Sequence, residues 1–142
     1  FTGKYWNSIP DPYSDSQKRS EVKSWILTGA ILMMLAVLFG AFGAHGLKNR
    51  VSPEDLIIFE TGVRYHMIHA LGLILLGILG FHYHGDVIQL PALLLSAGIL
   101  IFSGSLYILV LTGIRWMGAI TPIGGLAFIA GWAMLFIKIR SA

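Results

Sequence analysis

Four long apolar stretches, separated by short polar segments, dominate the pattern of this chain. They contain no Asp, Glu, Lys or Arg and run between Lys23 and Lys48, Arg64 and Asp86, Asp86 and Arg115, and Arg115 and Lys138. A helix needs about 20 mostly apolar residues to cross the hydrocarbon core of a bilayer, and all four stretches reach that length. Backbone groups in lipid must be satisfied within the protein, so the pattern predicts an all-α integral membrane four-helix bundle.

The pattern divides the chain into a polar N-terminal tail and one membrane domain. The tail covers residues 1–23 and the bundle residues 24–142, with helices expected at about 25–46, 53–81, 87–111 and 116–139. The second helix has two start signals: Ser52 can cap it, and Pro53 suits the first helical position. The last helix has two interpretations: it begins near Trp116 and kinks at Pro122, or Thr121 caps a helix that begins at Pro122.

Small residues recur at helical spacing in three of the predicted helices. Close packing through such residues drives helix association in lipid, so these stripes are expected to face one another. The stripes are Ala36, Gly40 and Gly43; Ala92, Ser96, Ser103 and Tyr107; and Gly118, Thr121, Gly125 and Trp132.

Composition supports a membrane protein and excludes several kinds of site. Hydrophobic residues make up 56% of the chain and charged residues 12%, against roughly 25% in soluble domains. The chain has no cysteine, which excludes disulfides, thiol nucleophiles and thiolate metal sites. We find no phosphate loop, nucleophile triad or intramembrane acid pair, so we predict a protein that is not an enzyme and binds no nucleic acid.

The distribution of Lys and Arg favours a topology with both termini in the cytoplasm. The first apolar stretch is too long for the core of a signal peptide, although the start at Phe1 leaves a preceding segment open. The bias is carried by Lys4, Lys18, Arg19, Lys23, Lys138 and Arg140.

The tail combines prolines that oppose a helix with large side chains that can dock. Ordering a tail costs roughly 1–2 kcal/mol per residue and needs compensating contacts. We therefore predict that it docks on a partner protein or on the bundle through Phe1, Tyr5, Trp6, Ile9 and Tyr13.

Two polar groups stand out within the membrane helices. His66 and His69 share one face of the second helix, and a polar cluster in one leaflet is formed by His45, His66, His69, Ser103, Ser105 and Tyr107. A buried hydrogen-bonding network that sets helix register is the favoured interpretation; a ligand or metal site is the alternative, and no metal is predicted. On the opposite face, Glu60 precedes Arg64 by four residues, which predicts an ion pair that anchors the helix, with a functional charge as the alternative.

Several strings in this order carry a resemblance to a known family: GAFGAH at 40–45, TGVRYH at 61–66 with HAL at 69–71, FSGSLY at 102–107, and TPIGG at 121–125 with GW at 131–132. Together they resemble the YgdD-like family of small inner-membrane proteins, a domain of unknown function of the DUF423 type. The resemblance covers about residues 25–140 and implies four membrane helices, but it brings no activity, cofactor or catalytic residue. It implies the bacterial inner (cytoplasmic) membrane, with the mitochondrial inner membrane as the alternative.

These observations predict a non-enzymatic accessory subunit of a larger membrane complex, with an energy-transducing complex as one candidate host. Its partners would be membrane lipids and that complex; no cofactor is predicted, and bound lipid is expected. One alternative is a small transporter or ligand-binding module that uses the polar cluster. Another is a haem or chlorophyll carrier with His66 or His69 as axial ligand.

Overall fold

The computed structural model describes residues 12–142, and their side chains from residue 15 onward. The docking residues Phe1, Tyr5, Trp6 and Ile9, and the side chain of Tyr13, therefore lie outside the described part. The helices are α1 (Pro12–Phe42), α2 (Pro53–Leu79), α3 (Gly85–Gly98), α4 (Gly104–Thr112) and α5 (Thr121–Ser141). Wider π-helical turns occupy Gly43–Leu47 and Ile99–Ser103, and a 3₁₀ turn occupies Arg115–Ala119.

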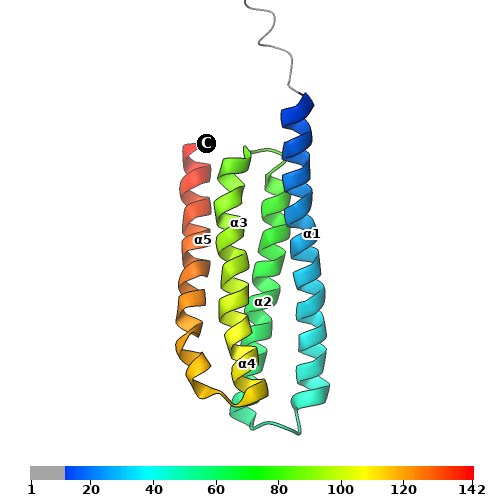
Figure 1. The fold of residues 1–142 in the computed structure, drawn as a ribbon, viewed down its shortest axis with the longest axis vertical. Coiled ribbons are helices and arrows are strands. Elements are labelled where there is room, and N and C mark those ends of the chain that lie inside the picture. Colours follow the sequence, from blue (N-terminus) through cyan, green and yellow to red (C-terminus); the bar gives the residue numbers. More distant parts are fainter. Residues whose placement is uncertain (1–11) are drawn as a thin grey trace, which may run out of the picture.

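The prediction of a four-helix membrane bundle is confirmed. Among the described residues, four helical segments are long and apolar enough to cross a membrane: Asp15–Leu47, Pro53–Leu79, Gly85–Thr112 and Arg115–Ser141. The third segment joins α3 and α4 through the π-helical turn. Figure 1 shows the start of α1 and the C-terminus at the same end of the bundle, as four spans require.

The first helix begins earlier than the sequence pattern predicts. Residues 12–23, expected to belong to an extended polar tail, form the first turns of α1. Pro12 stands at the helix start, where its fixed φ is compatible with the helix and its missing N–H removes no internal hydrogen bond. Asp15 lies in the first turn, and Nε of Arg19 contacts its carboxylate at 2.9 Å. The proline therefore marks the beginning of the helix rather than preventing one.

The helices are arranged so that α1 and α5 are the outer elements. In Figure 1, α1 packs on α2, α2 on the α3–α4 segment, and α3 on α5. Half of the most apolar stretch of the second and third spans is buried, against 17% for the first and 22% for the fourth. The outer helices therefore expose most of their apolar surface to lipid.

Two hydrophobic clusters fill the interior. The cluster nearer the termini contains Ala70, Leu73, Leu76, Val87, Ile88, Ala92, Leu95, Ile99 and Phe128. The cluster nearer the other end contains Leu47, Phe59, Val63, Tyr107, Leu109 and Val110. Along α2, His66 and His69 fall between the members of the two clusters, so polar side chains occupy the level where the clusters meet.

The helix starts agree with their sequence signals in most respects. Ser52 caps α2, and its Oγ accepts a hydrogen bond from the backbone N–H of Asp55 at 3.1 Å. Pro122 lies in the first turn of α5, which agrees with the shorter of the two interpretations of the last helix. Thr121 does not cap that helix, however: it is the first helical residue, and its hydroxyl contacts Ser105 in α4. Gly113 ends α4 with φ of 74°, a conformation that glycine adopts without strain.

The small-residue stripe is confirmed on α1 and shifted on α5. Ala36 and Gly43 are buried, and a Cβ on Gly43 would meet the ring of Phe59 at 3.0 Å. On α5 the buried residues are Gly124, Phe128 and Gly131, not the predicted stripe with Gly125 and Trp132. A Cβ on Gly124 would overlap the backbone of Phe102. The prediction for α5 was wrong because the stripe with Gly124 and Gly131 and the stripe with Gly125, one residue further along, both offer small residues, so the sequence does not say which of them faces the bundle.

Candidate functional site

A layer of buried polar side chains joins the helices in the interior of the bundle. Of the predicted polar cluster, the structure buries His66, His69, Ser103, Ser105 and Tyr107. His45, the sixth member, is exposed in the π-helical turn that ends the first span. Its membership was wrong because the π-helical turn leaves its ring on the surface of the bundle.

His66 joins α2 to α4 within this layer. Its Nδ1 lies 3.2 Å from the hydroxyl of Tyr107, and the Tyr107 ring stacks on Phe39 and packs against Phe59 at 4.6 and 5.0 Å between centroids. The other ring nitrogen of His66, Nε2, is buried without a hydrogen-bond partner among the described residues. In the part of the chain that the structure describes, it is the one buried side-chain nitrogen or oxygen without a partner, and leaving such an atom unpaired is costly.

Two serines join other pairs of helical segments. Ser103, in the π-helical turn before α4, donates to the backbone carbonyl of Gly62 in α2 at 2.7 Å. The hydroxyls of Ser105 in α4 and Thr121 in α5 lie 2.7 Å apart. Each contact crosses between different segments, and each would be lost if one segment moved along its axis. The layer therefore has the geometry of a network that sets helix register.

His69 faces α5 rather than α4. Its Nδ1 lies 2.7 Å from the carbonyl oxygen of Tyr65, so Nδ1 carries the proton and donates, and its ring stacks on Phe128 with centroids 3.4 Å apart. His66 and His69 thus make their contacts with different helices, although they share the buried side of α2. Within residues 12–142, no group of three or more His, Asp or Glu side chains is placed to hold a metal ion.

The predicted ion pair between Glu60 and Arg64 is not formed. The ion pairs among the described residues are Arg19 with Asp15 and Arg115 with Asp55. An i,i+4 pair on an open helix surface gains only about 0.3–0.5 kcal/mol, so the spacing alone does not hold the two side chains together.

Both charges instead line an open groove between α1 and α2. The groove has a volume of about 240 Å³ and is lined by Gly40, Gly43, Phe59, Glu60, Val63, Arg64 and Met67. Glu60 and Arg64 are exposed, whereas His66 and His69 are buried, which confirms that the two pairs occupy different faces of α2.

An ion pair between Asp55 and Arg115 was missed by the sequence analysis. The two guanidinium nitrogens Nη1 and Nη2 of Arg115 donate to the two carboxylate oxygens of Asp55, with Nη2 to Oδ2 at 2.9 Å. The contact joins the first turn of α2 to the 3₁₀ turn before α5, at the end of the bundle opposite the termini. In the sequence, the only sign of this pair was that Asp55 and Arg115 each lie beside a turn at the membrane boundary.

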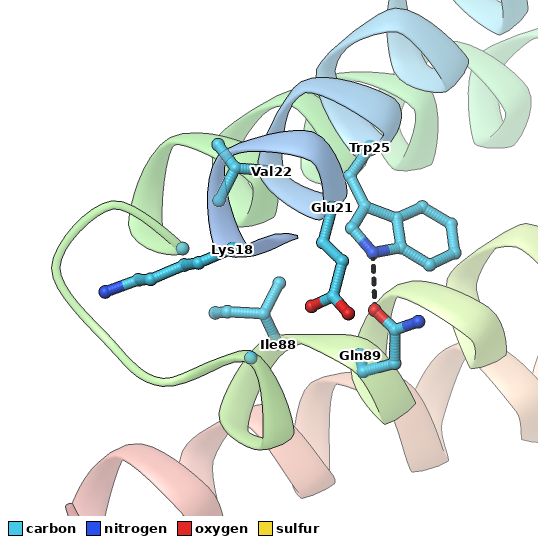
Figure 2. Close-up of a pocket in the computed structure, with 8 residues that line it drawn as sticks. Lys18, Glu21, Val22, Trp25, Ile88 and Gln89 are labelled. Carbon is cyan, nitrogen blue, oxygen red and sulfur yellow. Dashed lines mark hydrogen bonds between the residues drawn. The ribbon is translucent and has the colours of Figure 1, made fainter. Parts of the chain in front are cut away.

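A second polar area lies between α1 and the start of α3. Figure 2 shows the indole of Trp25 above Gln89, with Nε1 donating to Oε1 at 2.9 Å, and the carboxylate of Glu21 between the two helices. A Cβ on Gly85 would lie 2.8 Å from that carboxylate. The pocket here has room for about 10 Å³, roughly one water molecule. Glu21 lies at the positive end of α3, which favours a carboxylate there.

Comparison with known proteins identifies the family. The family model described as "Protein of unknown function (DUF423)" matches residues 39–125. The chain belongs to this family. Its relatives include a UPF0382 membrane protein of Staphylococcus haemolyticus, 50% identical over 117 residues, and the UPF0382 membrane protein YwdK of Bacillus subtilis, 48% identical over 117 residues. Each match covers 82% of this chain and 95% of the relative. No solved structure matches significantly.

The family membership confirms the resemblance drawn from the sequence. This DUF423 protein is a small integral membrane protein with bacterial relatives that are named as membrane proteins. Several of the strings that carried the resemblance contain residues of the polar layer: His66, His69, Ser103, Ser105, Tyr107 and Thr121.

Proposed function

We propose that this protein is a non-enzymatic accessory subunit of a larger assembly in the bacterial cytoplasmic membrane. The supporting observation is the groove between α1 and α2, where Glu60 and Arg64 are exposed and have no ion-pair partner in the described chain. Charged residues in membrane segments almost always face a partner, a bundle interior or water. A protein partner that covers this groove satisfies both charges, while lipid covers the remaining apolar faces.

The position of the two charges along α2 strengthens the proposal. The helix has 27 residues and is therefore about 40 Å long, some 10 Å more than the hydrocarbon core. If that excess is shared between the two ends, Arg64 lies about 11 Å inside the core and Glu60 about 5 Å. On this equal sharing both charges lie within the hydrocarbon region, where a partner stabilises them most.

Gentle extraction followed by native electrophoresis and mass spectrometry tests the proposal. We expect the wild-type chain to migrate in a complex larger than one 15.5 kDa copy with its detergent. Glu60→Gln and Arg64→Gln should weaken that complex, while Arg140→Gln, which changes an exposed charge in the last turn of α5, should not. Migration of the wild-type protein as a single copy would contradict the proposal. Deleting residues 1–11 in the same assay measures the contribution of the aromatic tail.

A second candidate function, a ligand-binding or transport module, is favoured by the unpartnered Nε2 of His66. A ligand or water chain that reached this nitrogen would satisfy it. Water-edited NMR of histidine-labelled protein in lipid tests this, with the exposed His45 as the hydrated control. Contact of the His66 ring with water supports the module, and a ring as dry as the surrounding core contradicts it.

A further inference from the structure

We propose that the partner in the groove between α1 and α2 is a second copy of this chain, so that Glu60 of each copy pairs with Arg64 of the other. This inference rests on the proposed function and names its partner. The groove carries one charge of each sign, one helical turn apart on the same helix. A surface with both signs is self-complementary, because two copies related by a twofold axis exchange the same pair twice.

The geometry of α2 suits such an arrangement. Two copies inserted in the same direction are related by a twofold axis perpendicular to the membrane. Glu60 of one copy and Arg64 of the other are then offset by about 6 Å along the helices, a distance that these two long side chains can bridge. Two ion pairs form, and none of the four charges remains alone in the hydrocarbon region.

The apolar residues beside the charges extend the same surface. Positions 60, 64, 67, 68 and 71 recur at helical spacing, and Met67, Ile68 and Leu71 are 37%, 53% and 50% exposed. Met67 lines the groove next to Arg64, and a flexible Met side chain adapts well to an irregular surface. Gly40 and Gly43 line the groove on the α1 side and have no side chains to fill it. The two helices also approach closely here, because a Cβ on Gly40 would lie only 3.3 Å from Val63.

A phospholipid is a poorer match for this groove than a second copy. The phosphate of a headgroup would attract Arg64 but repel Glu60, which shares the groove. Headgroups also lie outside the hydrocarbon core, whereas both charges lie within it when the excess length of α2 is shared between its two ends. The second copy satisfies both charges at the same depth.

Charge reversal in the full chain tests the inference. Self-association is measured by energy transfer between two differently labelled populations reconstituted in neutral lipid vesicles. Glu60→Arg alone and Arg64→Glu alone place like charges together and should weaken self-association by at least about tenfold. The double variant Glu60→Arg with Arg64→Glu recreates both pairs in reversed order, so it should self-associate like the wild type. Wild type and double variant should not mix, because their contacts would be Glu with Glu and Arg with Arg.

Cysteine cross-linking checks the surface without changing any charge. The chain has no native cysteine, so Met67→Cys introduces a unique thiol beside the groove. It should cross-link two copies in membranes, whereas Ile129→Cys, at a position 67% exposed on α5, should not.

If the double variant fails to self-associate while the wild-type chain still migrates in a larger complex, the second copy is excluded and another partner remains. Copies that stay monomeric in vesicles, with Arg64→Gln reducing only the co-purification of anionic lipid, also overturn the inference. Single-copy migration of the wild type overturns the proposed function as well.

Discussion

Gly124→Ala is expected to destabilise the protein by about 2 kcal/mol, because the new Cβ would overlap the backbone of Phe102. It would overlap the backbone N of Phe102 and lie 2.7 Å from its Cα, and backbone atoms cannot move aside as a flexible side chain can. Overpacking costs about 1–3 kcal/mol, and here the whole of α5 must shift away from the π-helical turn Ile99–Ser103. The higher helix propensity of alanine offsets at most about 1 kcal/mol.

Gly125→Ala is the matched control for this experiment. Its Cβ would meet only the ring of Phe102, at 3.8 Å, an ordinary packing distance. Both variants gain the same helix propensity, so the difference between their unfolding temperatures in detergent isolates the clash. Equal unfolding temperatures would show that α5 does not approach Phe102 as closely as the structure has it.

Tyr107→Ala is expected to cost about 3 kcal/mol, since it removes a buried ring that contacts Phe39, Phe59 and His66. The side chain is only 7% exposed, so truncation leaves a cavity beside α2. The unfolding free energy of the variant in lipid or detergent measures this loss. A cost near zero would mean that the cluster around Phe59 repacks around the vacant position.

Tyr107→Phe separates the hydrogen bond from the packing. It keeps the ring and removes the hydroxyl, so Nδ1 of His66 loses its partner and neither ring nitrogen then has one among the described residues. Hydrogen bonds between membrane helices contribute about 0.6 kcal/mol on average, so a cost of about 1 kcal/mol is expected. Tyr65→Phe is the control, because the Tyr65 hydroxyl makes no hydrogen bond within residues 12–142. Equal effects of the two Phe variants would argue against a role of the polar layer in helix register.

The number and nature of the helices could be predicted from the sequence because lipid leaves few alternatives. Long uncharged stretches must become helices when no water is available for the backbone. The start of α2 was equally predictable, since Ser52 and Pro53 act within one turn. The start of α1 was not, because Pro12 is compatible both with a disrupted helix and with a first helical turn.

The polar layer was predictable only as a group at one depth. Counting residues places His66, Ser103 and Tyr107 at a similar level, but it does not say which side chain meets which helix. The π-helical turn Ile99–Ser103 changes the rotation of α4 relative to α3, and no proline or charge marks it. The contact of Ser105 with Thr121 likewise depends on which face of α5 packs on the bundle, and the sequence analysis placed that face one residue away from the observed one.

The sequence by itself determined the membrane location, the four spans, the Ser52 cap of α2 and the family, because each depends on local composition or on neighbouring residues. Tertiary structure alone decided the contacts between distant segments. It paired Asp55 with Arg115 across the end of the bundle, and it left Glu60 and Arg64 unpaired along a groove although their spacing predicted a local pair. The physical reason is that local backbone rules operate within a few residues, whereas ion pairs and buried hydrogen bonds depend on how whole helices rotate and pack.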